Sequence, residues 1–140
     1  MSQDIYISGP IMAPGPDGGL PTELLLAERK RKFHNVAKKI RDNVGPTTLV
    51  INPLEVEACR RGTTKPSCEG ADNGKHTWRC YMRYDLEQLV MCEEIVMLEG
   101  WEDSPGATVE FNVAQMLGLE TSFWCDEHKS AHPTPCKEKK

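Results

Sequence analysis

Apolar and polar residues alternate in blocks along this chain, and the blocks predict alternating strands and helices. Short apolar runs at residues 5–7, 47–51, 94–98 and 121–124 are typical of buried strands. Helical periodicity marks residues 22–43, 78–92 and 104–118. Strands that alternate with helices favour a parallel sheet with helices on both faces. One domain is the natural count for 140 residues.

Two segments do not follow this pattern. Residues 54–77 are polar and rich in Gly, Cys and charge, so we expect an inserted loop. Residues 125–140 are polar and lack periodicity, which predicts a tail without regular structure. The predicted domain therefore covers residues 1–124 and contains the Cys-rich insert.

The helix predicted at 104–118 carries a charge on its apolar side. Ser104 is suited to the N-cap, Pro105 to the first helical position and Gly118 to the end. Seven residues form a wide apolar arc: Ala107, Val109, Phe111, Val113, Ala114, Met116 and Leu117. Glu110 lies inside that arc, where a charge is costly unless it is paired. Glu110 therefore marks a site, or else its head group reaches water at the rim of the arc.

A second carboxylate, Asp85, lies at the edge of the apolar stripe of the helix at 78–92. Two inward-facing carboxylates suit chemistry at a sugar's anomeric carbon, where one attacks and the other handles the leaving group's proton. We expect the field of the helix start to keep Glu110 ionised, and apolar neighbours to raise the pKa of Asp85. The alternative is that Asp85 forms a salt bridge with Arg79 or Arg83.

Several loops should meet near these carboxylates, because ligands of parallel sheets bind outside the carboxyl ends of the strands. The candidate binding residues at these ends are Ser8, Gly9, Pro10, Asn52, Trp101, Ser104 and Gly106. No dinucleotide-binding or P-loop glycine motif is present in the sequence.

Charge and hydropathy argue against two classes of partner, nucleic acids and membranes. The net charge of −4 argues against a nucleic-acid-binding protein, and the basic run 29–32 is interpreted as a solvated helix face. No apolar run has the length of a membrane span, and the polar residues 1–4 do not resemble a signal peptide. We therefore expect a cytoplasmic protein without a membrane partner.

The cysteine and histidine residues permit two zinc sites, although neither has the close Cys-x-x-Cys pairs that are typical of zinc. The two candidate sets are Cys59, Cys68, His76 and Cys80, and Cys125, His128, His132 and Cys136. We favour ordinary free thiols and no metal. Cys92 ends an apolar helix face and is expected in the core.

The chain resembles the nucleoside 2-deoxyribosyltransferase-like superfamily, most closely its small branch found in phages and bacteria. The resembling segments, in order, are residues 5–10, 33–37, 51–53, 81–86 and 100–107, then Glu110 and the turn at 117–119. The insert and the residues after 124 lie outside the resemblance. Asn112 and Glu93 stand where many relatives have Gly and Asp, which leaves the substrate less certain than the fold.

The resemblance implies a flavodoxin-like (Rossmann-like) three-layer sandwich with a four- to five-stranded parallel sheet. It also implies cleavage of N-glycosidic bonds in nucleosides or nucleotides, by hydrolysis or by deoxyribosyl transfer, without a cofactor. Glu110 matches the nucleophile, Asp85 the carboxylate that assists at the base, and Tyr6 a tyrosine that orients the nucleophile. A homodimer or larger assembly is expected, because relatives complete their sites across subunits. A phage-encoded protein would act in the host cytoplasm.

Three assignments have simpler alternatives. Ser104 resembles a phosphate-binding serine of nucleoside 5′-monophosphate N-glycosidases, but a serine there is also an ordinary N-cap. Trp101 would stack on a base, or else it covers the core. The simpler alternative for Tyr6 is a core aromatic residue without a role in orienting the nucleophile. For the whole protein, the alternatives are a non-catalytic nucleotide-binding module and a zinc-stabilised interaction protein.

Overall fold

The computed structural model describes residues 4–10, 22–52 and 78–135 of the chain. The side chains of residues 78–81 also lie outside this description. The elements in chain order are β1 (Ile5–Ser8), α1 (Glu23–Val44), β2 (Val50–Ile51), α2 (Trp78–Leu89), β3 (Glu94–Met97), the 3-10 helix η4 (Trp101–Asp103), α3 (Pro105–Leu117), β4 (Glu120–Cys125) and β5 (Ser130–His132).

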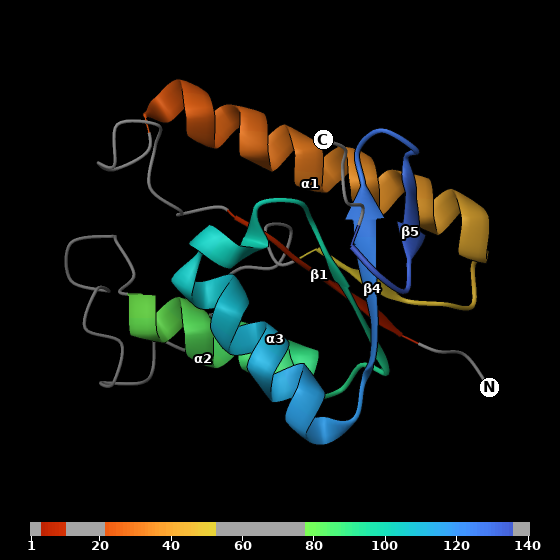
Figure 1. Ribbon diagram of the computed structural model, residues 1–140. Helices are drawn as coiled ribbons and strands as arrows, with labels where there is room; N and C mark the ends of the chain where they lie inside the picture. Colours follow the sequence, from red (N-terminus) through yellow and green to blue (C-terminus); the bar gives the residue numbers. More distant parts are fainter. Residues whose placement is uncertain (1–3, 11–21, 53–77, 136–140) are drawn as a thin grey trace.

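Among the described residues the strands form one five-stranded sheet in the order β2-β1-β3-β4-β5. β1 pairs in parallel with β2 and β3, and β3 pairs in parallel with β4. Helix α1 covers one face of the sheet, and α2 and α3 cover the other (Figure 1). This strand order and layering confirm the predicted flavodoxin-like α/β sandwich.

The two faces follow from the period-two alternation of β1 and β3. Ile5, Ile7, Val96 and Leu98 pack with α1, whereas Tyr6, Ile95 and Met97 belong to the cluster beneath α2 and α3. Helices α1 and α3 begin or end at the caps that the sequence predicts. Thr22 Oγ1 accepts from the Leu25 N–H at 3.1 Å, and Gly118 ends α3 in the left-handed region.

One sequence-based expectation, that the residues after 124 form a tail without regular structure, is wrong. β4 extends to Cys125, and Ser130–His132 form β5, which pairs antiparallel with β4. The segment 125–132 therefore continues the sheet and is not an irregular tail. The apolar arc of α3 is only partly buried: Met116 and Leu117 are 81% and 55% exposed. The buried residues of α3 are Ala107, Glu110 and Ala114. The predicted insert at 54–77 lies outside the described residues.

Candidate active site

Glu110 is buried in the middle of the molecule, with 5% of its surface exposed. It faces the sheet because Ala107, Glu110 and Ala114 are three, four and seven residues apart, which places them on one side of α3. The flanking alanines have short side chains and bring α3 close to the strands. The alternative of a head group that reaches water is therefore excluded for this conformation.

Two hydroxyl groups of β1 hold the Glu110 carboxylate. Tyr6 Oη donates to Oε2 at 2.8 Å, and Ser8 Oγ donates to Oε1 at 2.5 Å. Tyr6 and Ser8 are two residues apart in a strand, so both side chains point to the α3 face. Burial and the neighbouring carboxylates raise the pKa of Tyr6 well above its ordinary value, which keeps its hydroxyl protonated and able to donate.

The electrostatics of Glu110 differ from the expectation for a helix start. Burial raises the pKa of Glu110 to about 7, and the hydrogen bonds from Ser8 and Tyr6 oppose that rise. The field of α3 was expected to keep this group ionised, but desolvation has the larger effect. The two hydroxyl donors are therefore the groups that favour the carboxylate form near neutral pH.

Asp85 projects from α2 and is half-buried. Burial, and then the charge of Glu110, raises the pKa of Asp85 to about 7. No ion pair joins Asp85 to Arg83, and the Arg79 side chain lies outside the described residues. Among the described residues no hydroxyl group donates to Asp85, whereas two donate to Glu110, and these bonds favour Glu110 as the ionised member of the pair.

The strand ends bring most of the predicted binding residues to this side of the molecule. Ser8, which was expected to bind a ligand, donates a hydrogen bond to Glu110. The alternation from Tyr6 places Ser8 on the α3 face of β1, but the contact itself depends on how closely α3 approaches the strand. Asn52 follows β2 and is 1% exposed. Pro10 lies against Gly100, 3.3 Å from the position of a Cβ there, so the loops after β1 and β3 are adjacent.

Gly9 is required by packing. A Cβ at Gly9 would lie 2.9 Å from Leu98 Cβ and 3.1 Å from Phe33 Cζ. A larger residue would push the end of β1 away from these neighbours and move Ser8 relative to Glu110.

Ser104 and Trp101 have structural contacts of their own. Ser104 is buried, and its Oγ accepts from the Ala107 N–H at 3.3 Å as the N-cap of α3. Among the first three residues of α3, Pro105 has no N–H and the Ala107 N–H bonds Ser104. The Gly106 N–H is therefore the one that could donate to a ligand. The Trp101 ring packs against Phe111 with a centroid distance of 4.6 Å. N-cap and aromatic packing thus account for both residues without a ligand.

Of the predicted free thiols, Cys92 is confirmed and Cys125 is not. Cys92 is a free thiol in the core, and burial raises its pKa to about 12, which makes it unreactive at neutral pH. Cys125 is disulfide-bonded, so the expectation of a free thiol is wrong there. Its Sγ lies 3.2 Å from His128 Nδ1, and the His128 and His132 rings are 5.7 Å apart.

No group of three or more metal-binding side chains is found in the described part of the chain. The candidates Cys59, Cys68, His76 and Cys136, and the side chain of Cys80, lie outside it. Within the described ranges, no helix has the length and apolar character needed to cross a membrane.

The fold and site define an α/β protein with a buried carboxylate, Glu110, and a half-buried one, Asp85, at the carboxyl edge of its parallel strands. The chain belongs to the family described as a domain of unknown function, DUF4406, which matches residues 3–123. No curated protein matches the sequence. The family boundary ends within β4, so β5 lies beyond the matched region.

Proposed function

We propose that this protein cleaves the N-glycosidic bond of a nucleoside or nucleotide, with Glu110 as nucleophile. The observation that carries the proposal is the environment of Glu110: a buried carboxylate with two hydroxyl donors and a second carboxyl group beside it. The resemblance to nucleoside 2-deoxyribosyltransferases supports it, because Glu110, Asp85 and Tyr6 match the residues that such enzymes use.

In the proposed first step, a Glu110 oxygen attacks C1′ of the sugar while the bond from C1′ to the base nitrogen breaks. Asp85 donates its proton to the departing base, and the sugar becomes an ester of Glu110. Each Glu110 oxygen accepts one hydrogen bond from β1 and keeps a second lone pair for C1′.

In the second step, water attacks C1′ and gives a proton to Asp85, which releases the free sugar and restores Glu110. A second base in place of water would give transfer. The reaction needs one carboxylate and one protonated acid, and the raised pKa of Asp85 supports the acid role near neutral pH.

Substrate class depends on Ser104 and Gly106. The N-cap hydrogen bond uses a lone pair of Ser104 Oγ and leaves its proton for an acceptor such as a phosphate oxygen. The Gly106 N–H lies in the same turn. We therefore include 5′-monophosphates with free nucleosides as candidate substrates.

The test is a chromatographic assay of free base with a panel of nucleosides and 5′-monophosphates. Glu110→Gln should reduce base release by about 10⁴-fold or more. Glu23→Gln, an exposed change in the first turn of α1, is the matched control and should not alter the rate. Ligands that raise the melting temperature without any base release would refute the enzyme and indicate a nucleotide-binding module.

A further inference from the structure

A cleft on the α1 face of the molecule has the charge and size of a ligand site. Its volume is about 440 Å³, and its lining comes from α1, from β4 and from the turn between β4 and β5. The lining residues are Glu28, Arg31, Lys32, Asn35, Val36, Lys39, Trp124, Asp126 and Lys129. Small-molecule sites have volumes of about 300–1,000 Å³.

The cleft is separate from Glu110. Val36 and Trp124 belong to the core cluster between α1 and the sheet, whereas Tyr6 belongs to the cluster on the opposite face. The α1 residues of the lining recur every three or four positions, so they form one stripe that faces the hairpin. This placement makes the cleft independent of the proposed glycosidic chemistry.

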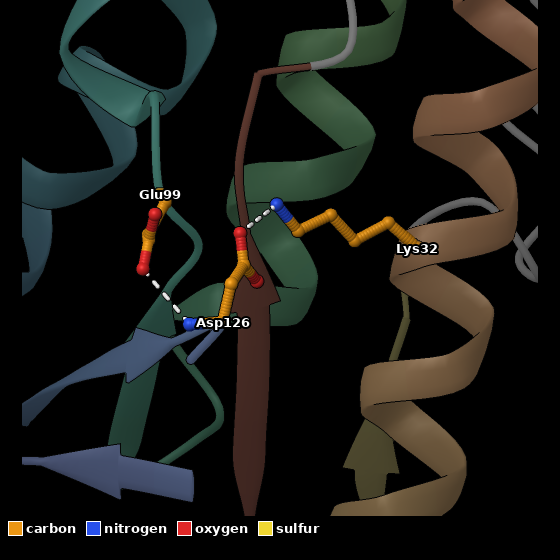
Figure 2. A network of polar contacts seen from close by, with 3 residues as sticks. All are labelled: Lys32, Glu99 and Asp126. Atoms are coloured by element: carbon orange, nitrogen blue, oxygen red, sulfur yellow. Dashed lines mark hydrogen bonds and ion pairs between the residues drawn. The ribbon is translucent and has the colours of Figure 1, made fainter. Parts of the chain in front are cut away.

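An ion pair joins the two walls of the cleft. Lys32 Nζ lies 2.5 Å from the Asp126 carboxylate, and the Asp126 N–H donates to Glu99 Oε2 at 2.8 Å (Figure 2). These contacts connect α1, the β4–β5 turn and the segment after β3. The turn is thereby held against α1, and the charge of Asp126 is neutralised by Lys32.

The remaining charges of the lining are mostly positive. Arg31, Lys39 and Lys129 oppose Glu28, which leaves a net charge of +2 in a protein whose net charge is −4. The three cations form no ion pair within the part of the chain that the structure describes. Trp124 and Val36 supply an apolar floor, and Asn35 an amide.

We propose that this cleft binds a small molecule that carries two or more phosphate groups. Arg31 and Lys39 are eight residues apart on α1, or about 12 Å along the helix axis, a separation that two or more phosphate groups span better than one. Lys129 approaches from the other wall. Arg donates to two phosphate oxygens and Lys acts as a point charge, so the set suits a diphosphate or triphosphate.

A small ligand fits better than a nucleic acid. The cations without an ion pair among the described residues line a concave cleft, and the overall negative charge of the chain opposes a long polyanion. Lys38 is a natural control. It lies on α1 outside the cleft lining and pairs with Asp42 at 3.3 Å.

The experiment is a titration of the ¹⁵N-labelled full chain with inorganic pyrophosphate and with ATP, followed by two-dimensional NMR. We expect saturable shifts of the Trp124 indole N–H and of amides in 31–39 and 126–129. The double variant Arg31→Gln/Lys39→Gln should weaken binding by at least about ten-fold, and Lys38→Gln should not. Unchanged unfolding midpoints would show that both variants remain folded.

Three results would overturn the proposal. One is the absence of saturable shifts in the cleft, and another is an equal effect of Lys38→Gln and the double variant. The third is tighter binding of a 20-base-pair DNA duplex than of ATP, which would indicate a nucleic-acid surface. Shifts around Glu110 alone would assign the phosphate to the active site. Base release plays no part in this test, so failure of either proposal leaves the other intact.

Discussion

The two faces of the sheet bury different chemistry beneath their helices. Under α1, the odd-numbered β1 residues Ile5 and Ile7 belong to one hydrophobic cluster with Val36 and Ile40. Under α3, Tyr6 and Ser8 occupy the equivalent strand positions and hold a buried carboxylate. The same strand therefore supplies a hydrocarbon surface to one helix and hydrogen-bond donors to the other.

Because of this difference, the α1 face contributes mainly to stability, and the α3 face carries the groups proposed to react. Burial of hydrocarbon on the α1 face stabilises the fold. Burial of Glu110 and Asp85 raises the pKa of both acids to about 7, so ionisation of either group costs folding free energy at neutral pH. Active sites commonly have this cost, and the apolar packing on the opposite face offsets it.

The largest expected effect is on stability and comes from the α1 face. Ile40→Ala should reduce the free energy of unfolding by about 2–5 kcal/mol, because it leaves a cavity in a packed cluster. Urea unfolding measures the loss. Base release per folded molecule should stay near that of the wild type. A large fall in that rate, at unchanged folded fraction, would show that the two faces are coupled.

Asp85→Asn should lower the rate of base release without lowering stability, the reverse of Ile40→Ala. Loss of the proton donor should lower base release by about 10²–10⁴-fold, and most strongly for substrates with a poor leaving group. Stability at pH 8 should not fall, because a buried charge is removed. The measurement compares the rate for a nucleoside whose base leaves readily without a proton with the rate for an ordinary nucleoside. Equal losses for both would argue against Asp85 as the acid.

The sequence predicted the layers of this fold because each helix and strand carries a local signal. The caps at Thr22, Ser104 and Gly118 could be identified from residue type, and all three are present. β5 was missed because Ser130–His132 has no apolar alternation. Its pairing with β4 is tertiary, and an edge strand needs little hydrophobic character.

The candidate site was partly predictable from the sequence, because some of its residues also carry a local signal. Glu110 and Asp85 stand out against apolar helix faces, and Tyr6 follows from the resemblance. The contact from Ser8 to Glu110 depends on how closely α3 approaches β1, which no local pattern states. The basic cleft also requires the hairpin turn to fold against α1, and the sequence shows only the helical stripe.

The buried acids should also change how stability depends on pH. A carboxyl group whose folded pKa is raised contributes stability below its unfolded pKa, and this is lost as pH rises towards the folded value. The ordinary pKa values are 3.8 for Asp and 4.5 for Glu, and the pKa of each of the two acids in the folded protein is about 7. The urea midpoint should therefore fall between about pH 4 and pH 7.

Glu110→Gln and Asp85→Asn should each flatten this pH dependence, since each variant removes one titrating group. A double variant should flatten it further, by less than the sum, because the charge of Glu110 contributes to the pKa shift of Asp85. A wild-type midpoint that rises steadily from pH 4 to pH 7 would contradict the assignment of two buried acids with raised pKa values.

The smallest predicted change tests the hydroxyl donors themselves. Ser8 lowers the pKa of Glu110 by donating to Oε1, so Ser8→Ala should raise that pKa and move the acid limb of the pH–rate profile upward. The rate below pH 7 should fall by about ten-fold, the value of one hydrogen bond to a charged group. At high pH the difference from the wild type should narrow.

Ser122→Ala is the matched control for Ser8→Ala. Ser122 Oγ donates to Glu94 Oε2 at 2.9 Å across the β3–β4 pair, and this bond lowers the pKa of a different carboxyl group. The same atoms are removed from the same sheet, away from Glu110, so the pH–rate profile should not move. If both variants shifted the profile equally, the effect would belong to the sheet as a whole. A shift in Ser8→Ala alone would assign the tuning of Glu110 to the α3 face of β1.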